Sequence, residues 1–263
     1  MKFTKMQGLG NDYLYFWGEI ENPEEVSRRL SDRHFGAGSD GIITISPSEI
    51  ADYKMRIFNA DGSEAMMCGN GIRCVGKYVY DKGCTDKTAL RIETRSGVKT
   101  LRLDVRCGKV RRVAVDMGRA AVSEDMTLEV DGISVTVTPV NVGNPHAVCF
   151  VPDADSVPLG EIGPKIEKHP AFPGGVNAEF VSLRADGGLR MRVWERGSGI
   201  TMACGTGACA SASAAVSKGL CKTGERIPVR LDGGTLDIEV SPDFAVTMTG
   251  PAEFVYEGEI SDD

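Results

Sequence analysis

Apolar and polar positions along the chain predict a first run of strands and helices that ends near residue 117. Apolar stretches bounded by turn residues predict strands over 13–17, 42–46 and 53–59. Asn22 followed by Pro23 predicts a helix start, with Asn22 as the N-cap and the helix running to about residue 34. A longer helix is expected over 68–82, stopped by Gly83. Alternating strands over 90–94, 99–105 and 110–117 predict a small antiparallel system.

A second run of elements repeats this plan from about residue 113. Residues 128–137 predict a hairpin that turns at Asp131-Gly132. Strands are expected over 147–151 and 178–183, with a short helix over 160–169. An Ala/Ser-rich helix is expected over 204–218, and a hairpin turning at 232–234 follows it. The small side chains of that helix suit a position inside a strongly curved sheet.

One stretch occurs twice and links the two runs. Residues 55–71 read MRIFNADGSEAMMCGNG and residues 191–207 read MRVWERGSGITMACGTG, with six of seventeen positions identical. Each copy reaches a cysteine, Cys68 or Cys204, and each cysteine lies fifteen residues before the glycine of a Lys-Gly pair. A Gly-Asn pair also precedes each copy. This agreement indicates a duplicated unit of about half the chain, with one cysteine in each half.

Composition and charge narrow the class of protein. At 263 residues the chain is long enough for two ordinary domains, and the 41% apolar content is typical of globular proteins. A formal charge of −7 argues against nucleic acid as a partner, because phosphate binding needs a basic surface. No stretch approaches eighteen apolar residues, and the N-terminus lacks an apolar signal region, so we expect a cytoplasmic protein without membrane partners. The oligomeric state is not defined, and a homodimer is one expectation.

The eight cysteines are expected as free thiols in a reducing compartment. None of them forms a Cys-x-x-Cys pair, and the three histidines lie far apart in sequence. A metal site therefore has little support. The six cysteines outside the repeated pair are expected to be structural.

The repeated cysteines stand where a loop meets a helix, and each is followed by Gly-x-Gly. The first turn of a helix offers free N–H groups and a positive dipole end, which bind a carboxylate and lower the pKa of a thiol. Two such sites would hold one carboxylate with a sulfur on each face of the adjacent carbon. One thiolate could then remove the α-proton while the opposite thiol returns a proton, without metal or other cofactor.

At these residues the chain resembles diaminopimelate epimerases over its whole length. Residues 59–73, NADGSEAMMCGNGIR, fit the family signature without a mismatch. Further landmarks are Gly-Leu-Gly-Asn-Asp at 8–12, Gly-Asn-Pro-His at 143–146, and the run from Glu195-Arg196 to Gly207. The resemblance implies interconversion of LL- and meso-2,6-diaminopimelate in lysine and peptidoglycan precursor synthesis.

The resemblance also implies a fold and a division into domains. The implied fold is mixed α/β (α+β), with two similar domains, each a curved antiparallel sheet around a central helix. The C-terminal segment is expected to return to the first domain. The domains are then 1–112 with 250–263, carrying Cys68, and 113–249, carrying Cys204.

The resemblance assigns roles to individual residues. Cys68 and Cys204 are the acid/base pair, and the backbone at Gly69, Asn70, Gly205 and Thr206 holds the reacting carboxylate. Glu195 and His146 are placed beside the reacting centre, where they could tune the thiols or take the amine. The residues expected at the distal end of the substrate are Asn11, Asn59, Asn144, Asn177 and Arg196, of which Arg196 suits a carboxylate.

Two positions depart from the commoner family pattern, and two other functions compete. Gly41 stands where some members have a glutamine, and Ile200 replaces a usual acidic residue before Cys204.

A proline racemase-like enzyme is the nearest alternative, but Arg196 and the asparagines favour a substrate with a second polar end. A thiol-disulfide switch is the other alternative, although a switch would not need duplicated Gly-x-Gly sites.

Overall fold

The computed structural model describes residues 1–260, which divide into two compact units. Unit 1 comprises Met1–Asp116 with the segment from Gly250, and unit 2 comprises Met117–Thr249. The boundary predicted from the sequence, after residue 112, lies four residues earlier than this one. One strand, Lys109–Arg119, runs through both positions, so the sequence has no break that marks the boundary. Within residues 1–260 no helix is long and apolar enough to span a membrane.

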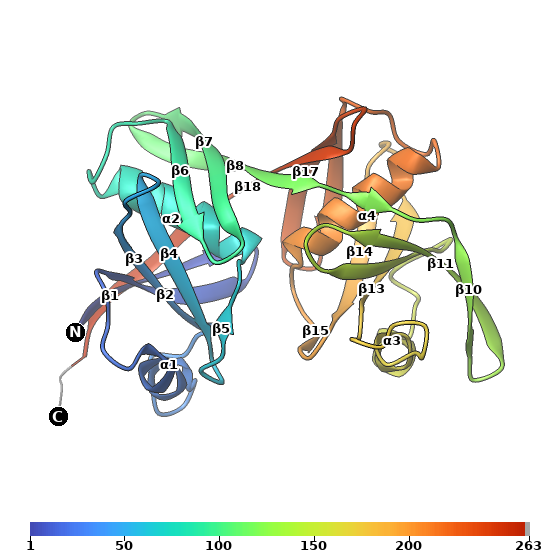
Figure 1. Ribbon diagram of the computed structural model, residues 1–263, viewed down its shortest axis with the longest axis horizontal. Coiled ribbons are helices and arrows are strands. Elements are labelled where there is room, and N and C mark those ends of the chain that lie inside the picture. Colours follow the sequence, from blue (N-terminus) through green and yellow to red (C-terminus); the bar gives the residue numbers. More distant parts are fainter. Residues whose placement is uncertain (261–263) are drawn as a thin grey trace. The chain divides into compact units, whose positions relative to one another are not determined.

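Unit 1 is a curved sheet with one helix on each face (Figure 1). Its elements are β1 (Lys2–Gly8), β2 (Asn11–Trp17), α1 (Pro23–Ser31), β3 (Gly41–Pro47), β4 (Tyr53–Asn59), β5 (Glu64–Ala65), α2 (Gly69–Asp81), β6 (Ala89–Thr94), β7 (Gly97–Arg106), β8 (Lys109–Arg119) and β19 (Glu253–Glu259). The strands pair in the order β19-β1-β2-β3-β4-β6-β7-β8. The C-terminal strand therefore completes the first unit, as expected.

Unit 2 repeats this arrangement. Its elements are β9 (Ala121–Val122), β10 (Met126–Val130), β11 (Ile133–Asn141), β12 (Pro145–Phe150), α3 (Leu159–Glu167), β13 (Asn177–Leu183), β14 (Leu189–Glu195), β15 (Gly199–Ile200), α4 (Gly205–Ser217), β16 (Arg226–Leu231), β17 (Gly234–Val240) and β18 (Ala245–Gly250). The strands pair in the order β11-β12-β13-β14-β16-β17-β18, so β11 to β18 correspond to β1 to β8. The duplication and the fold class are confirmed.

Each sheet is mixed rather than wholly antiparallel. In unit 1 the pairs β2–β3 and β4–β6 are parallel, and in unit 2 the pairs β12–β13 and β14–β16 are parallel. The reason is that α1, α2, α3 and α4 lie between the strands of these pairs along the chain. A helical connection lets the chain return to the same edge before the next strand begins.

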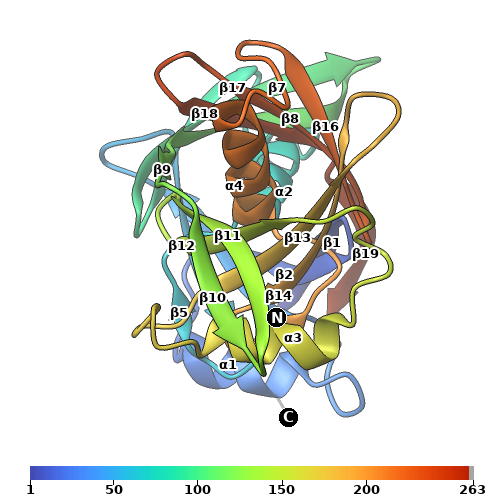
Figure 2. The ribbon, with the colours of Figure 1, turned by 90° about the vertical axis from the view of Figure 1, so that its right-hand side faces the viewer.

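The helices α2 and α4 occupy the centres of their units. The residues of α4 from Gly207 to Ala215 are all buried, and Figure 2 shows this helix within the curve of its own sheet. It contacts strands β11, β12, β13, β14, β16 and β17, and its small side chains permit this close approach. On the other face of each sheet, α1 and α3 cover an apolar cluster that includes Phe58 in unit 1 and Phe180 in unit 2.

The first helix departs from its expected ends. Asn22 has a left-handed backbone and makes no side-chain capping bond, whereas the sequence predicted a cap. The helix ends at Ser31, not near residue 34, because the carboxylate of Asp32 accepts hydrogen bonds from the backbone N–H groups of His34 and Phe35. That local turn competes with a further helical turn.

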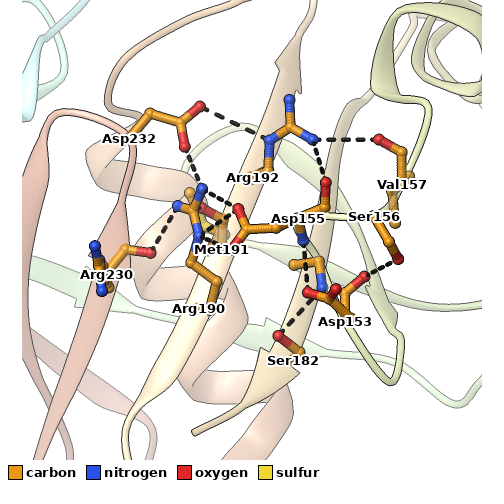
Figure 3. Close-up of polar contacts among 11 residues, drawn as sticks. Asp153, Asp155, Ser156, Val157, Ser182, Arg190, Met191, Arg192, Arg230 and Asp232 are labelled. Carbon is orange, nitrogen blue, oxygen red and sulfur yellow. Dashed lines mark hydrogen bonds and ion pairs between the residues drawn. The ribbon is translucent and has the colours of Figure 1, made fainter.

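A charged cluster fixes the start of β14, the strand that leads to the predicted site (Figure 3). The guanidinium of Arg190 contacts Asp155, at 2.6 Å, and Asp232. Arg192 donates to the backbone oxygen of Val157 at 3.2 Å. The cluster thus ties β14 to the segment before α3 and to the turn between β16 and β17.

Candidate active site

Both repeated cysteines cap the N-terminus of a 13-residue helix. Cys68 precedes α2 and Cys204 precedes α4, and both have extended backbones. The Cys68 sulfur accepts a hydrogen bond from the Gly71 N–H at 3.4 Å, and the Cys204 sulfur accepts one from the Gly207 N–H at 3.3 Å. The remaining N–H groups of each first turn have no partner within the helix, so each end can receive an anion.

The second glycine of each Gly-x-Gly is required by packing under the helix. A Cβ placed on Gly71 would lie 2.7 Å from the Ile43 Cδ1 atom. One placed on Gly207 would lie 2.8 Å from Oε1 of Glu179 and 3.2 Å from the Cys204 sulfur. A larger residue would therefore displace the Ile43 side chain in unit 1, and the Glu179 side chain or the thiol in unit 2.

In unit 1 the thiol lies among amides. The Cys68 sulfur donates to Oδ1 of Asn11 at 3.3 Å, and the Asn70 amide donates to the same oxygen at 3.4 Å. The Asn11 amide nitrogen donates to Asp40 at 2.7 Å, which fixes the orientation of the amide. Asn11 was expected at the distal end of the substrate, and the structure places it beside the thiol of its own unit.

In unit 2 the thiol is buried beside carboxylates. Burial raises the pKa of Cys204 well above its ordinary value, and the charges of Glu195 and Glu179 raise it further. Hydrogen bonds from Thr206 and the Gly207 amide lower the same pKa by less. The sequence predicted a lowered thiol pKa at the helix end, and for Cys204 that expectation is wrong because desolvation outweighs the helix end.

Glu195 ends β14 next to this thiol. Its carboxylate accepts a hydrogen bond from the Thr201 hydroxyl. Burial raises the pKa of Glu195, and the charge of Glu179 adds to that rise, while Thr201 and His146 oppose it. A partly buried carboxylate beside a thiol can accept a proton or bind an ammonium group.

His146 joins this group through both ring nitrogens. Nδ1 lies 2.7 Å from Oε1 of Glu179, and Nε2 lies 3.0 Å from Oδ1 of Asn144. Asn144 in turn donates to the Thr206 hydroxyl at 3.4 Å. Glu179 was not predicted from the sequence. The one signal was a single charged residue within the buried strand β13.

Asn177 and Arg196 lie together at the ends of β13 and β14. Oδ1 of Asn177 accepts the Arg196 backbone N–H at 3.0 Å, and its amide donates to the Pro145 oxygen at 2.9 Å. The Arg196 guanidinium donates to the Gly174 oxygen at 3.0 Å. The guanidinium carries five N–H donors, so it can also bind a carboxylate.

Of the remaining predicted residues, some lie next to a cysteine and others lie at the ends of strands. In unit 1, Gly69 begins the helix next to Cys68, whereas Asn59 ends β4 and bonds the Ser63 hydroxyl at 3.0 Å. In unit 2, Gly205 begins α4 next to Cys204. Gly41 begins β3, and a Cβ there would lie 2.1 Å from the Phe58 carbonyl oxygen, which explains why this chain carries no glutamine at that position.

Two similar sheets, each with a cysteine at the start of its central helix, place the chain in the fold class of solved amino-acid racemases and epimerases. A hydroxyproline epimerase from Agrobacterium vitis shares the fold with a TM-score of 0.79 at 18% identity, over 100% of this chain and 93% of its own. A phenazine biosynthesis protein of the PhzF family from Bacillus anthracis has a TM-score of 0.80 at 16% identity, over 99% of each chain. These low identities show the fold alone.

Sequence comparison identifies the family within this class. The chain belongs to the diaminopimelate epimerase family, whose profile matches residues 3–123 and 138–255. A diaminopimelate epimerase from Acetivibrio thermocellus is 52% identical over 277 residues, covering 99% of this chain and 98% of its own. The resemblance drawn from the cysteine motifs is thereby confirmed.

Proposed function

We propose that the protein is a cofactor-independent epimerase that interconverts LL- and meso-2,6-diaminopimelate, with Cys68 and Cys204 as its acid and base. The observation that carries the proposal is the matched position of the two thiols. Each caps a 13-residue helix at the same point of the duplicated unit. Full-length relatives named diaminopimelate epimerase support the choice of substrate.

The proposed reaction exchanges one proton at each face of the α-carbon. The thiolate of one cysteine removes the α-proton and becomes a thiol, while the thiol of the other gives its proton to the opposite face and becomes a thiolate. The two roles are therefore reversed after each turnover. The first-turn N–H groups at Gly69, Asn70, Gly205 and Thr206 stabilise the charge that moves onto the carboxylate.

Glu195 is proposed to receive the α-amino group of the substrate. An ammonium next to this partly buried carboxylate offsets the desolvation that raises its pKa. The same cation favours the thiolate of Cys204, whose pKa is raised by burial and by the neighbouring carboxylates. Substrate binding would thus prepare this thiol for proton transfer, with His146 as a further tuning group.

Arg196 is proposed to bind the distal carboxylate of the substrate with the donors that its bond to Gly174 leaves available. The amides proposed to join it are Asn59 and Asn177. Asn11 and Asn144, which were also expected at the distal end, are proposed to bind the substrate closer to the thiols, because their side chains lie beside Cys68 and Thr206. Proline has no second polar end, so this set favours diaminopimelate over a proline racemase substrate.

A direct assay tests the proposal. The purified protein, without added pyridoxal phosphate, is expected to convert LL-diaminopimelate to the meso form and to leave L-proline unchanged. Chiral chromatography of both mixtures measures this. Inversion of proline, or no inversion of diaminopimelate under reducing conditions, would contradict the proposed substrate.

We also propose a cytoplasmic location and a role in supplying lysine and peptidoglycan precursors. All eight cysteines are free thiols, which suits a reducing compartment. A homodimer stays a prediction, which sedimentation analysis would test.

A further inference from the structure

Unit 2 contains a buried carboxylate that the proposed reaction does not use. Glu179 lies in β13 with no exposed surface, and its Oε1 atom is 2.7 Å from Nδ1 of His146. Its second oxygen has no hydrogen-bond partner among residues 1–260. Burying a carboxylate is unfavourable unless a partner charge or a hydrogen-bond network compensates. The position therefore needs an explanation beyond packing.

The duplicated unit shows that packing does not require a carboxylate here. Ile43 of β3 lies under Gly71 of α2 in unit 1, just as Glu179 lies under Gly207 of α4 in unit 2. In both units this strand runs parallel to the strand before it and antiparallel to the strand after it. An apolar side chain fills the same place in one unit, so the acid in the other has a chemical role.

The partner of Glu179 is also specific to unit 2. Tyr13 stands two residues after Asn11, and His146 stands two residues after Asn144. The duplicated positions thus hold a tyrosine and an isoleucine in unit 1, but a histidine and a glutamate in unit 2. The difference is a pair of side chains that can carry opposite charges.

A chain of polar contacts leads from Glu179 to the thiol of unit 2. The His146 Nε2 atom lies 3.0 Å from the Asn144 oxygen, and the Asn144 amide donates to the Thr206 hydroxyl at 3.4 Å. That hydroxyl lies 3.5 Å from the Cys204 sulfur. All five residues belong to one unit, and they come from β12, β13, α4 and the turns that precede β12 and α4.

The direction of these hydrogen bonds depends on which nitrogens of the His146 ring carry protons. With protons on both nitrogens, His146 donates to Glu179 and to the Asn144 oxygen. The Asn144 amide then donates to Thr206, whose hydroxyl proton is left for the sulfur. Without the Nε2 proton, Asn144 must turn its NH₂ toward the ring and its oxygen toward Thr206, which then donates away from the sulfur.

We propose that Glu179 is a positioning residue for Cys204: as the counter-ion of a doubly protonated His146, it directs the hydrogen bonds of Asn144 and Thr206 toward the sulfur and stabilises the thiolate. This rests on the proposed acid/base role of Cys204. The Cys204 sulfur exchanges its proton only with the substrate carbon, and the His146 ring keeps both of its protons. No proton therefore moves along this series of hydrogen bonds.

Among the described residues of unit 1, the thiol has a different set of contacts. There the Cys68 sulfur donates to Asn11, whose amide nitrogen donates to Asp40. The carboxylate of Asp40 can only accept, so the Asn11 oxygen stays directed at the sulfur. The two thiols therefore have different hydrogen-bonding partners.

Glu179 has two opposite effects on the Cys204 thiolate, and the test separates them: its charge disfavours the thiolate directly, whereas its positioning of His146 favours it. Its negative charge, like that of Glu195, directly raises the pKa of Cys204. If charge alone mattered, Glu179→Gln would favour the thiolate and leave kcat unchanged or increased. The positioning role predicts that kcat falls about 10- to 100-fold, by analogy with the range for groups that orient metal-bound histidines, with KM within about twofold.

Asp237→Asn is the matched control, because Asp237 is a buried carboxylate of β17 in the same unit, paired with Arg226. We expect it to keep the wild-type kcat. A loss in Glu179→Gln that Asp237→Asn shares equally would overturn the proposal, since it would reflect removal of any buried carboxylate. Thermal unfolding of both variants checks that they are folded.

Nitrogen NMR of ¹⁵N-histidine-labelled protein reads the ring directly and needs no turnover. The chain has three histidines, so the signal of His146 is identified by its absence in His146→Asn. We expect both nitrogens of His146 to carry protons in the wild type at neutral pH and only one in Glu179→Gln. A singly protonated ring in the wild type would overturn the proposal whether or not the protein proves to be an epimerase.

A second variant keeps the test available if Glu179→Gln does not fold. His146→Tyr combined with Glu179→Ile copies the pair of unit 1, which that fold accommodates. We expect a folded protein with the same loss of kcat. A wild-type kcat in this double variant would show that the charged pair has no role in the reaction.

Discussion

Replacement of either Cys68 or Cys204 with alanine is expected to lower epimerisation by at least about 10⁴-fold, the upper range for loss of a general acid or base. Each turnover needs a proton acceptor on one face of the carbon and a donor on the other, so neither thiol can substitute for its counterpart. The rate from LL-diaminopimelate measures the loss. Circular dichroism should show an intact fold, since loss of one N-cap hydrogen bond costs only about 1 kcal/mol.

Cys221→Ala is the control for this experiment. Cys221 is a half-buried free thiol just beyond the end of α4, far along the helix from Cys204. We expect it to keep nearly full activity. Substantial activity in Cys204→Ala would instead show that one thiol suffices, and the two-cysteine reaction would have to be abandoned.

Loss of the Arg196 guanidinium is expected to have the next largest effect. Arg196→Gln should raise KM for diaminopimelate about 30- to 150-fold, which corresponds to about 2–3 kcal/mol for hydrogen bonds to a charged group. The contact of Asn177 with residue 196 uses the backbone N–H, so it survives the substitution. Steady-state kinetics should show most of the change in KM and little in kcat.

Arg184→Gln is the matched control, because Arg184 is an arginine of the same unit whose partner is Asp186, at 2.7 Å. Its KM should equal that of the wild type. If Arg196→Gln also bound the substrate normally, the distal carboxylate would have to be held by other residues.

The sequence predicted the central helices well because their signals are local. Lys-Gly pairs stop α2 and α4 where expected, and Asp131-Gly132 forms the hairpin turn with both residues at positive φ. The end of α1 was missed because the capping competition at Asp32 depends on side-chain geometry. The parallel strand pairs were missed because periodicity identifies strands without identifying their neighbours.

In the candidate site, the sequence predicted the cysteine motifs but not the groups that surround Cys204, for a related reason. The cysteines and their Gly-x-Gly runs are contiguous in sequence, so the duplication revealed them. The raised pKa of Cys204 depends on burial and on Glu195 and Glu179, which come from β14 and β13. Glu179 approaches the thiol only after β13 folds beneath α4, so its position could not be inferred from spacing.

The central claim is that the acid and the base are different thiols, and early isotope incorporation in deuterated water tests it most directly. With LL-diaminopimelate as substrate, the two-thiol reaction predicts deuterium at the inverted carbon of the first meso product, while the remaining LL substrate stays almost unlabelled. This follows because the thiol that removes the proton would return that same proton to the original face. Equal early labelling of substrate and product would mean that a single base exchanges with solvent, and it would contradict the proposed reaction.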